Sequence, residues 1–459
     1  MLMKLTRATG RAWGGVAALA LAGAAQGQDL GVPAPKQAGP IAIVGATVHP
    51  VSAAAIERGY VLFDGGKIVE VGAMAPGKAF AQGTTVVDAA GKHVWPGMIS
   101  PYTRLGLTEM GATRPSHDFN ETGEATPEAL PSVAVNPDST LIPVARANGV
   151  LAAGVFPASG IIPGRVSVIT TEGWTTEDLT LRRDAGLLVS WPMMRTIRAP
   201  WMDQSDEQQA TRTRESLERI RETFRTARAY LALKQADPDG TPTDIRWEAM
   251  RPALEGKAPT FIEAADYDQI VSAVGFAREF GLKPVIVGGR DAALCAGLLK
   301  AHDVPVIFNS VINLPRRDDS AYDEAYGTPA RLLAAGVRFC LASGEETPHE
   351  RNVPYAAAMA AAHGLDADAA YRSVSLWAAE ILGVADRVGS LEAGKDATLV
   401  IATGNPLEVT TKVEGAYIQG RRVSVRSKQN DLADKYREKY RQLGGPGGGP
   451  GKAPAGGAK

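Results

Sequence analysis

Short apolar segments alternate with helical patterns through the middle of this chain. The apolar segments cover residues 259–262, 284–287, 305–308 and 338–342, and helical patterns cover residues 266–280 and 291–301 between them. Apolar strands separated by helices favour a parallel sheet whose outside is covered by helices. The number of units that fits this chain length predicts a (β/α)8 barrel of the TIM type. An open doubly wound sheet is the alternative, but no Gly-x-Gly-x-x-Gly follows a strand, which disfavours its dinucleotide-binding form.

Both ends of the chain show a different pattern, with short strands and tight turns. Residues 60–64 and 67–71 flank Gly65-Gly66, and two glycines supply the positive φ angles of a tight hairpin. Residues 416–419 and 422–425 repeat the pattern around Gly420-Arg421. We therefore expect an α/β fold in which residues 41–96 and 384–426 form one small composite β-sandwich, beside a barrel of residues 97–383.

The first 27 residues have the order of a secretory signal peptide. Lys4, Arg7 and Arg11 precede an apolar stretch at residues 16–22, and Ala25-Gln26-Gly27 offers a small-x-small cleavage site. The stretch is shorter than the ~20 apolar residues that span a bilayer, and no later apolar run is long enough. The sequence predicts Sec-type export, no membrane span after cleavage, and a periplasmic location.

Two segments follow the second β region. Residues 428–443 carry apolar side chains at helical spacing, which predicts a terminal amphipathic helix that packs on the body; these are Leu432, Tyr436, Tyr440 and Leu443. Residues 444–459 contain no apolar side chain larger than alanine or proline. Such a segment cannot bury enough surface to offset its ordering entropy, so we expect it to be disordered.

A family resemblance rests on two segments. Val86 to Leu107 reads VVDAAGKHVWPGMISPYTRLGL, and Ala378 to Gly383 reads AAEILG, followed by GSLEAGKDATLVIATGNPL from Gly389. The first resembles the segment that enters the barrel in amidohydrolases of the imidazolonepropionase-like group. The second resembles the segment by which those chains return to the β domain. The resemblance implies a TIM-like barrel beside a composite β-sandwich, with metal-assisted hydrolysis of C–N bonds, usually through zinc.

The family chemistry needs imidazole and carboxylate ligands, and most of the ligand positions hold other residues in this chain. Alignment on Pro96-Gly97 places Ser100 at the family's aspartate, and Tyr102 and Arg104 at its His-x-His pair. A guanidinium cannot ligate a metal. The later positions are Glu263 for the third ligand, Gly288 for the fourth and Gly344 for the catalytic aspartate. The resemblance therefore implies a degenerate site without a normal binuclear centre.

Two interpretations of Arg104 stay open. As a fixed cation at the barrel mouth it could hold an anion or polarise a carbonyl, with Tyr102 and Glu263 beside it. Asn309, which follows a predicted strand, is a further candidate residue of the mouth. Alternatively, Arg104 and Glu263 form a charge pair that plugs the site. Either way Arg104 disfavours a metal, because two like unit charges 4 Å apart repel by about 4 kcal/mol at an effective dielectric near 20.

A relocated metal site is a further possibility. Glu345, Glu346 and His349 cluster after the last barrel strand, where catalytic residues lie on this fold, and both residue types bind zinc. Pro348 favours a loop there over a helix. A solvated charge cluster explains the same three residues.

Two functions follow from these residues. By resemblance, the chain is a hydrolase of non-peptide C–N bonds in amides or cyclic amides. The missing ligands favour the alternative, a catalytically inactive barrel that binds a small anion or a protein partner around Tyr102, Arg104 and Glu263. The net charge of −1 gives no sign of a nucleic-acid partner.

Overall fold

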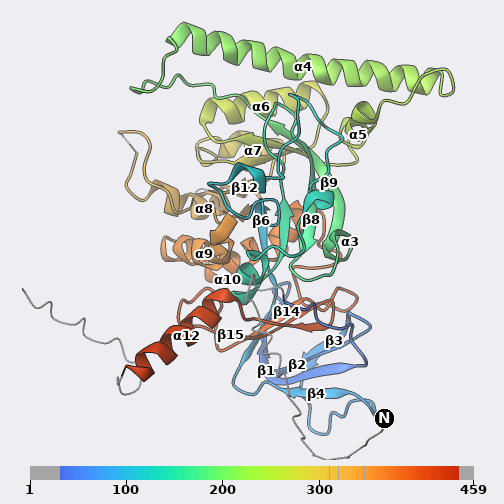
Figure 1. Cartoon of the computed structure of the whole chain (residues 1–459), viewed down its shortest axis with the longest axis vertical. Coiled ribbons are helices and arrows are strands. Elements are labelled where there is room, and N and C mark those ends of the chain that lie inside the picture. The colour runs from blue at the N-terminus through green and yellow to red at the C-terminus, as the bar shows by residue number, and fades with distance from the viewer. Residues whose placement is uncertain (1–30, 310, 319, 345–346, 444–459) are drawn as a thin grey trace, which may run out of the picture.

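The structure is a computed structural model that describes residues 31–443 apart from 310, 319 and 345–346. These residues form two eight-stranded sheets. Figure 1 shows the β domain below and the barrel with its helices above it. The predicted combination of a TIM-like barrel with a composite β domain is confirmed. The segments 1–27 and 444–459, for which we predict a signal peptide and a disordered tail, lie outside the described residues.

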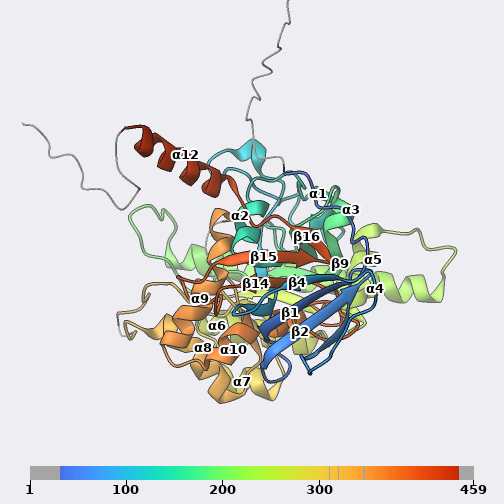
Figure 2. The same ribbon diagram turned by 90° about the horizontal axis from the view of Figure 1, so that it is seen from below.

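The β domain is a single sheet built from both ends of the chain. Its order is β16-β15-β14-β5-β1-β2-β3, and β4 pairs with the first half of β1. Strands from the two ends lie side by side, since β14 pairs with β5 (Figure 2). The hairpin between β2 and β3 turns at Gly65 and Gly66, whose φ angles are 55° and 81°. The strands are β1 (Ile41–Val48), β2 (Ile56–Asp64), β3 (Lys67–Ala73), β4 (Thr85–Asp88), β5 (His93–Pro96), β14 (Leu399–Ala402), β15 (Val413–Ile418) and β16 (Arg421–Val423).

The second sheet curves into a nearly closed barrel. In sheet order its strands are β6 (Met98–Thr103), β7 (Val150–Val155), β8 (Gly164–Thr170), β9 (Thr180–Ser190), β10 (Thr260–Ala264), β11 (Pro284–Gly288), β12 (Val306–Phe308) and β13 (Phe339–Leu341). β8 runs antiparallel to both of its neighbours, whereas the other neighbouring strands pair in parallel. A parallel crossover needs about a dozen residues or more. The connections 156–163 and 171–179 are shorter, so this side of the barrel departs from the expected helix-connected pattern.

Helices cover the parallel half of the barrel, as expected. These are α6 (Tyr267–Glu279), α7 (Ala296–Ala301), α8 (Glu324–Ala335), α9 (Val353–Ala362), α10 (Ala367–Ser373) and α11 (Leu376–Ile381). α6 begins after Asp266, whose backbone N–H donates to Gln269 Oε1 at 3.1 Å and so is satisfied at the helix start. The remaining helices are η1 (Arg114–Ser116), α1 (Pro131–Ala134), α2 (Ile142–Ala147), α3 (Thr176–Leu179), α4 (Asp206–Ala236), α5 (Ile245–Leu254), η2 (Thr347–Asn352) and α12 (Lys428–Gln442).

The long helix α4 lies across the top of the barrel in Figure 1. It buries Ile220, Phe224 and Ala227, whose spacing of four and three residues places them on one face of the helix. The rings of Phe224 and Phe276 meet edge to face with centroids 5.0 Å apart, which fixes α4 on α6. Neither α4 nor any other described helix is apolar enough over a sufficient length to cross a membrane.

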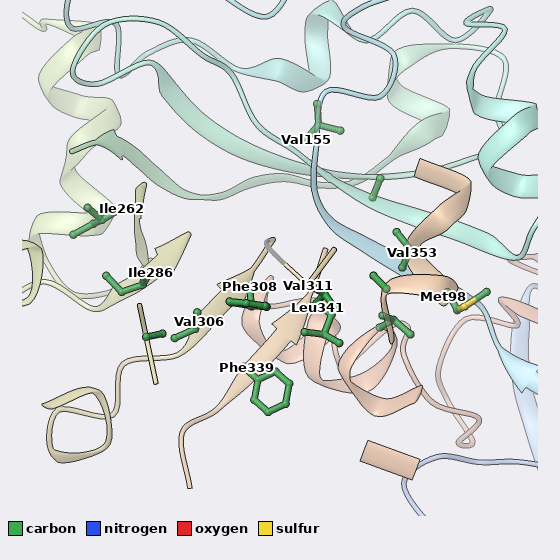
Figure 3. Packing of buried hydrophobic residues seen from close by; sticks show 14 of the residues in the cluster. Met98, Val155, Ile262, Ile286, Val306, Phe308, Val311, Phe339, Leu341 and Val353 are labelled. Atoms are coloured by element: carbon green, nitrogen blue, oxygen red, sulfur yellow. The ribbon is translucent and has the colours of Figure 1, made fainter. Parts of the chain in front are cut away.

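Alternate residues of the barrel strands belong to two separate cores. The outer core beneath the helices holds Ile262, Ile286, Val306, Phe308 and Leu341 (Figure 3). The core inside the barrel holds Phe261, Val285, Ile307 and Cys340. Side chains alternate between the two faces of a strand. The residue two positions after Phe261 is Glu263, and this alternation therefore directs its carboxylate into the barrel.

α12 projects from the body instead of packing on it (Figures 1 and 2). Its bounds agree with the predicted terminal helix, but the predicted packing is wrong, because none of its residues is buried. Leu432 is 48% exposed and Tyr440 is 62% exposed. A periodic apolar stripe shows that a helix is amphipathic, but it does not show what covers the stripe.

His49 lies where the β domain meets the barrel. Its ring stacks on Trp95 with centroids 3.5 Å apart, and its Nε2 lies 2.9 Å from Nδ1 of His93. Trp95 in turn contacts the Tyr371 ring of α10, with centroids 4.4 Å apart. Burial lowers the pKa of His49 to about 4, and the neighbouring His93 adds to this effect. His49 is therefore neutral in the folded protein at pH values where an unfolded histidine is charged.

We expect the folded state to lose about 1 to 2 kcal/mol of stability through His49 as the pH falls from 6.5 to 4, after allowance for its partial exposure. The unfolded chain binds a proton near pH 6.5, whereas the folded chain binds it only near pH 4. The stability that neutral His49 contributes is thus fully present above pH 6.5 and is lost progressively between pH 6.5 and pH 4. Urea unfolding at pH 7 and pH 4.5 measures this loss. His49→Gln should show a smaller loss than the unmodified protein, and an equal loss would contradict this assignment.

Candidate functional site

The barrel mouth collects residues from the carboxyl ends of five strands. Tyr102 lies in β6, Glu263 in β10 and Gly288 at the end of β11, while Asn309 and Gly344 follow β12 and β13. All five residues line one cavity of about 450 Å³. Functional sites of this fold lie at this end of the barrel. The structure thus brings together Tyr102, Glu263 and Asn309, three of the residues that the sequence analysis assigns to the mouth.

Glu263 is held by two hydroxyl groups. Tyr102 Oη donates a hydrogen bond to Glu263 Oε1 at 2.9 Å, and Ser190 Oγ donates one to Oε2 at 2.5 Å. Burial raises the pKa of Tyr102, and the charge of Glu263 raises it further, so the phenol keeps its proton and acts as the donor. Ser190 is missing from the sequence-based set. It is the register partner of Glu263 in the β9–β10 ladder, and that register is not visible in the sequence.

Arg104 does not form the predicted ion pair with Glu263. Its guanidinium carbon lies 4.6 Å from the centre of the Phe119 ring, which is a cation–π contact. Both carboxylate oxygens of Glu263 instead accept the hydroxyl hydrogen bonds described above. Arg104 lines a smaller cavity of about 140 Å³, which shares Tyr102, Asn309 and Gly344 with the larger one. The interpretation of Arg104 and Glu263 as a plug is therefore wrong, while Arg104 still faces the mouth.

Glu350 brings a second carboxylate to the mouth. It lies in η2, is only 2% exposed and lines the smaller cavity beside Arg104. Ser100 Oγ donates a hydrogen bond to Glu350 Oε2 at 2.5 Å. The sequence analysis selects the neighbouring His349 and misses Glu350, because the two partners lie 250 residues apart in the chain. The one sequence signal for such a partner is Ser100 at the family's aspartate position, because a hydroxyl buried there needs a hydrogen-bond partner.

The described residues of the mouth do not fit the zinc centre that the resemblance implies. Tyr102 and Arg104 stand at the His-x-His positions, and the Ser100 hydroxyl is bonded to Glu350. Nowhere in the described part of the chain do three His, Cys, Asp or Glu side chains gather as a metal group. Of the relocated cluster, His349 lies in η2, whereas residues 345–346 lie outside the described residues. The described residues of the mouth therefore support no reaction step through a metal.

Arginines line another wall of the larger cavity. Arg290 forms an ion pair with Asp266 and approaches Asp291 Oδ1 to 3.5 Å. Burial lowers the pKa of Arg290, and Arg316 is one of the neighbouring cations that add to this effect. Arg316 is exposed, lines the same cavity and forms no ion pair with any described residue. The wall therefore carries a positive charge that no ion pair with a described residue neutralises.

Comparisons with known proteins reveal a family. A sequence model described as the amidohydrolase family matches residues 309–423. The crystal structure of an amidohydrolase from Thermotoga maritima MSB8 is similar at 26% identity and a TM-score of 0.73, over 84% of this chain and 100% of that one. The chain belongs to the amidohydrolase superfamily. Its family match covers Gly344 and Glu350 but not Tyr102 and Arg104, so the degenerate His-x-His segment lies outside the matched residues.

Two further relatives of this amidohydrolase-superfamily chain are more distant. Amidohydrolase TasK from Hapsidospora irregularis is 25% identical over an alignment of 400 residues, and the match covers 79% of this chain and 39% of that protein. This chain therefore spans less than half the length of that curated relative. The structure of a Xaa-Pro dipeptidase with bound methionine has a TM-score of 0.52 at 12% identity, over 84% of this chain and 100% of that one. That similarity concerns the fold alone.

Proposed function

We propose that this amidohydrolase-superfamily barrel binds a small anionic molecule at its mouth without the metal centre of its family. One observation carries the proposal: Arg316, which has no ion-pair partner among the described residues, lines the same cavity as Tyr102 and Glu263 at the family's metal-ligand positions. An unpaired guanidinium binds carboxylates and phosphates through charge-assisted hydrogen bonds. The site is thus equipped to hold an anion where the family resemblance implies a metal cation.

The lining of the larger cavity narrows the class of ligand. Its volume of about 450 Å³ lies in the range of roughly 300 to 1,000 Å³ that small-molecule sites occupy. Trp191 and Met193 contribute an apolar wall, and Asn313 adds an amide near Arg316. Glu263 repels a second negative charge at the inner end of the cavity. The ligand we infer is a monoanion with an apolar or hydrogen-bond-donating body.

Thermal-shift and binding measurements test this function. We expect at least one of the monoanions acetate, N-acetylglycine or benzoate to raise the Tm of the protein, and Arg316→Ala to weaken that binding about tenfold, because the variant loses a charge-assisted hydrogen bond. Arg278→Ala is the matched control, since Arg278 is an exposed arginine on the outer helix α6. Binding that is equal in both variants, or the absence of any shift with these anions, would contradict the proposal.

Hydrolysis of C–N bonds in amides or cyclic amides is the second candidate function. It is supported by the similarity to the Thermotoga maritima amidohydrolase, which extends over the whole of that chain. Elemental analysis of protein purified without metal-affinity tags or chelators distinguishes the two functions. Stoichiometric zinc that His349→Ala removes, together with turnover of simple amides or cyclic imides, would favour the hydrolase. Zinc-free protein that binds the anions would favour the binding function. The signal-like order of residues 1–27 supports a periplasmic setting for either.

A further inference from the structure

The C-terminal helix α12 presents an apolar stripe that no part of the described chain covers. The stripe residues Leu432, Tyr436, Tyr440 and Leu443 are 48%, 50%, 62% and 72% exposed. An isolated helix of about 15 residues is only marginally stable in water, and α12 has 15 residues with none of them buried. The helix extends away from the body in both views, so a broad surface can reach the stripe (Figures 1 and 2).

The lysines and the acidic residues of α12 lie on different sides of this stripe. At about 100° per residue, the stripe side chains span about 80° of the helix circumference. Lys428, Lys435 and Lys439 fall within about 60° of one edge of it. Asp431, Asp434 and Glu438 fall on the opposite face. The sequence of α12 therefore separates a lysine-bordered apolar stripe from an acidic back.

Ion pairing leaves the net positive charge beside the stripe. On the back of the helix, Arg426 pairs with Asp431 and Asp434 at 2.7 and 2.6 Å, and Arg441 pairs with Glu438 at 2.6 Å. Lys435 and Lys439 form no ion pair with any described residue, and Lys439 lies 5.8 Å from the centre of the Tyr436 ring. The acids are thus neutralised, and the unpaired cations lie along the apolar edge.

We propose that α12 docks on an anionic phospholipid surface. A helix with an apolar face bordered by lysines lies in the membrane interface, where its apolar side chains enter the acyl boundary and the lysines extend to the headgroups. Tyrosine suits this boundary because its ring is apolar and its hydroxyl is polar. A second copy of the chain fits less well, since the acids of its α12 are already paired and its lysines repel those of the first copy.

Co-sedimentation of the full chain with vesicles tests the proposal. We expect the chain to bind vesicles of 30% phosphatidylglycerol in phosphatidylcholine at low salt, and to lose binding in 0.5 M NaCl, because salt screens the headgroup charge. Lys435→Glu with Lys439→Glu should weaken binding at least tenfold. Tyr436→Ser with Tyr440→Ser should weaken it as well, since binding also needs the apolar contact.

Matched controls separate this docking from general charge effects. Arg212→Glu with Arg214→Glu makes the same change in net charge on α4, at the opposite end of the molecule (Figure 1), and should leave vesicle binding unchanged. The α12 variants should keep the Tm of the parent, because α12 buries no residue. Equal binding to pure phosphatidylcholine, unchanged binding by the lysine variant, or a dimer that only the tyrosine variant dissociates would overturn the proposal.

Discussion

Replacement of Arg146 by alanine is expected to lower the free energy of unfolding by about 3 to 5 kcal/mol, because it leaves a buried carboxylate unpaired. Arg146, in α2, forms an ion pair with Glu172, and their side chains are only 9% and 5% exposed. Its guanidinium also donates to the carbonyl oxygens of Thr171 and Ser424 at 2.5 and 2.9 Å. One side chain thus joins the barrel to the segment that follows the β domain.

Urea unfolding of a small variant series measures this effect. Glu172 also accepts a hydrogen bond from the backbone N–H of Ala34 at 2.6 Å, so among the described residues Arg146→Ala leaves the Glu172 charge with a single neutral donor. The double variant Arg146→Met with Glu172→Leu removes both charges and should recover much of the loss. Arg426→Ala breaks a solvent-exposed pair and should change stability much less. A loss below about 1 kcal/mol in Arg146→Ala would show that the pair is not buried as the structure describes.

The outline of the fold is predictable because local chemistry decides it. Gly65 and Gly66 have the positive φ angles that their hairpin needs, and few other residues adopt such angles. The apolar segments at 259–262 and 284–287 become β10 and β11, since a strand buried on both faces must be apolar along its length. Each of these signals depends only on residues that are close together in the chain, so it can be recognised in the sequence.

The parts that could not be predicted depend on distant residues. β8 is buried along nearly all of its length, as its neighbour β7 is, yet it runs in the opposite direction. Strand direction depends on the connections and on pairing with other strands, which composition does not encode. The stripe of α12 is a similar case, because the helix forms as its periodicity predicts but no described residue buries the stripe.

The residues of the candidate site also fall into those that the sequence predicts and those that it does not. Tyr102, Glu263 and Asn309 are predictable because they end barrel strands, and strand ends meet at the mouth. Ser190 and Glu350 were missed because their roles come from the β9–β10 register and from a hydrogen bond across 250 residues. The family pattern thus gives the positions of a site, whereas the partners at those positions decide whether it suits a metal or an anion.

Gly344, at the position of the family's catalytic aspartate, should not tolerate a side chain. Its φ is +68°, in the left-handed region, and a Cβ there would collide with the carbonyl oxygen of Asn309. We expect Gly344→Ala and Gly344→Asp each to lower the free energy of unfolding by about 3 kcal/mol, through backbone strain together with displacement of Asn309. Restoring the family's aspartate is therefore expected to damage the mouth instead of rebuilding a metal ligand.

Gly281→Ala separates the two causes of this loss. Gly281 has a similar φ of +60° but no atom within 4 Å of the position of a Cβ, so its substitution should cost only about 1 to 2 kcal/mol. Urea unfolding gives the difference between the two sites, and elemental analysis shows whether Gly344→Asp gains zinc. If both substitutions lowered the free energy of unfolding equally, the collision with Asn309 would not contribute to the loss at Gly344. A stable, zinc-binding Gly344→Asp would show that this barrel retains the family's metal site, because the carboxylate could then replace a missing ligand.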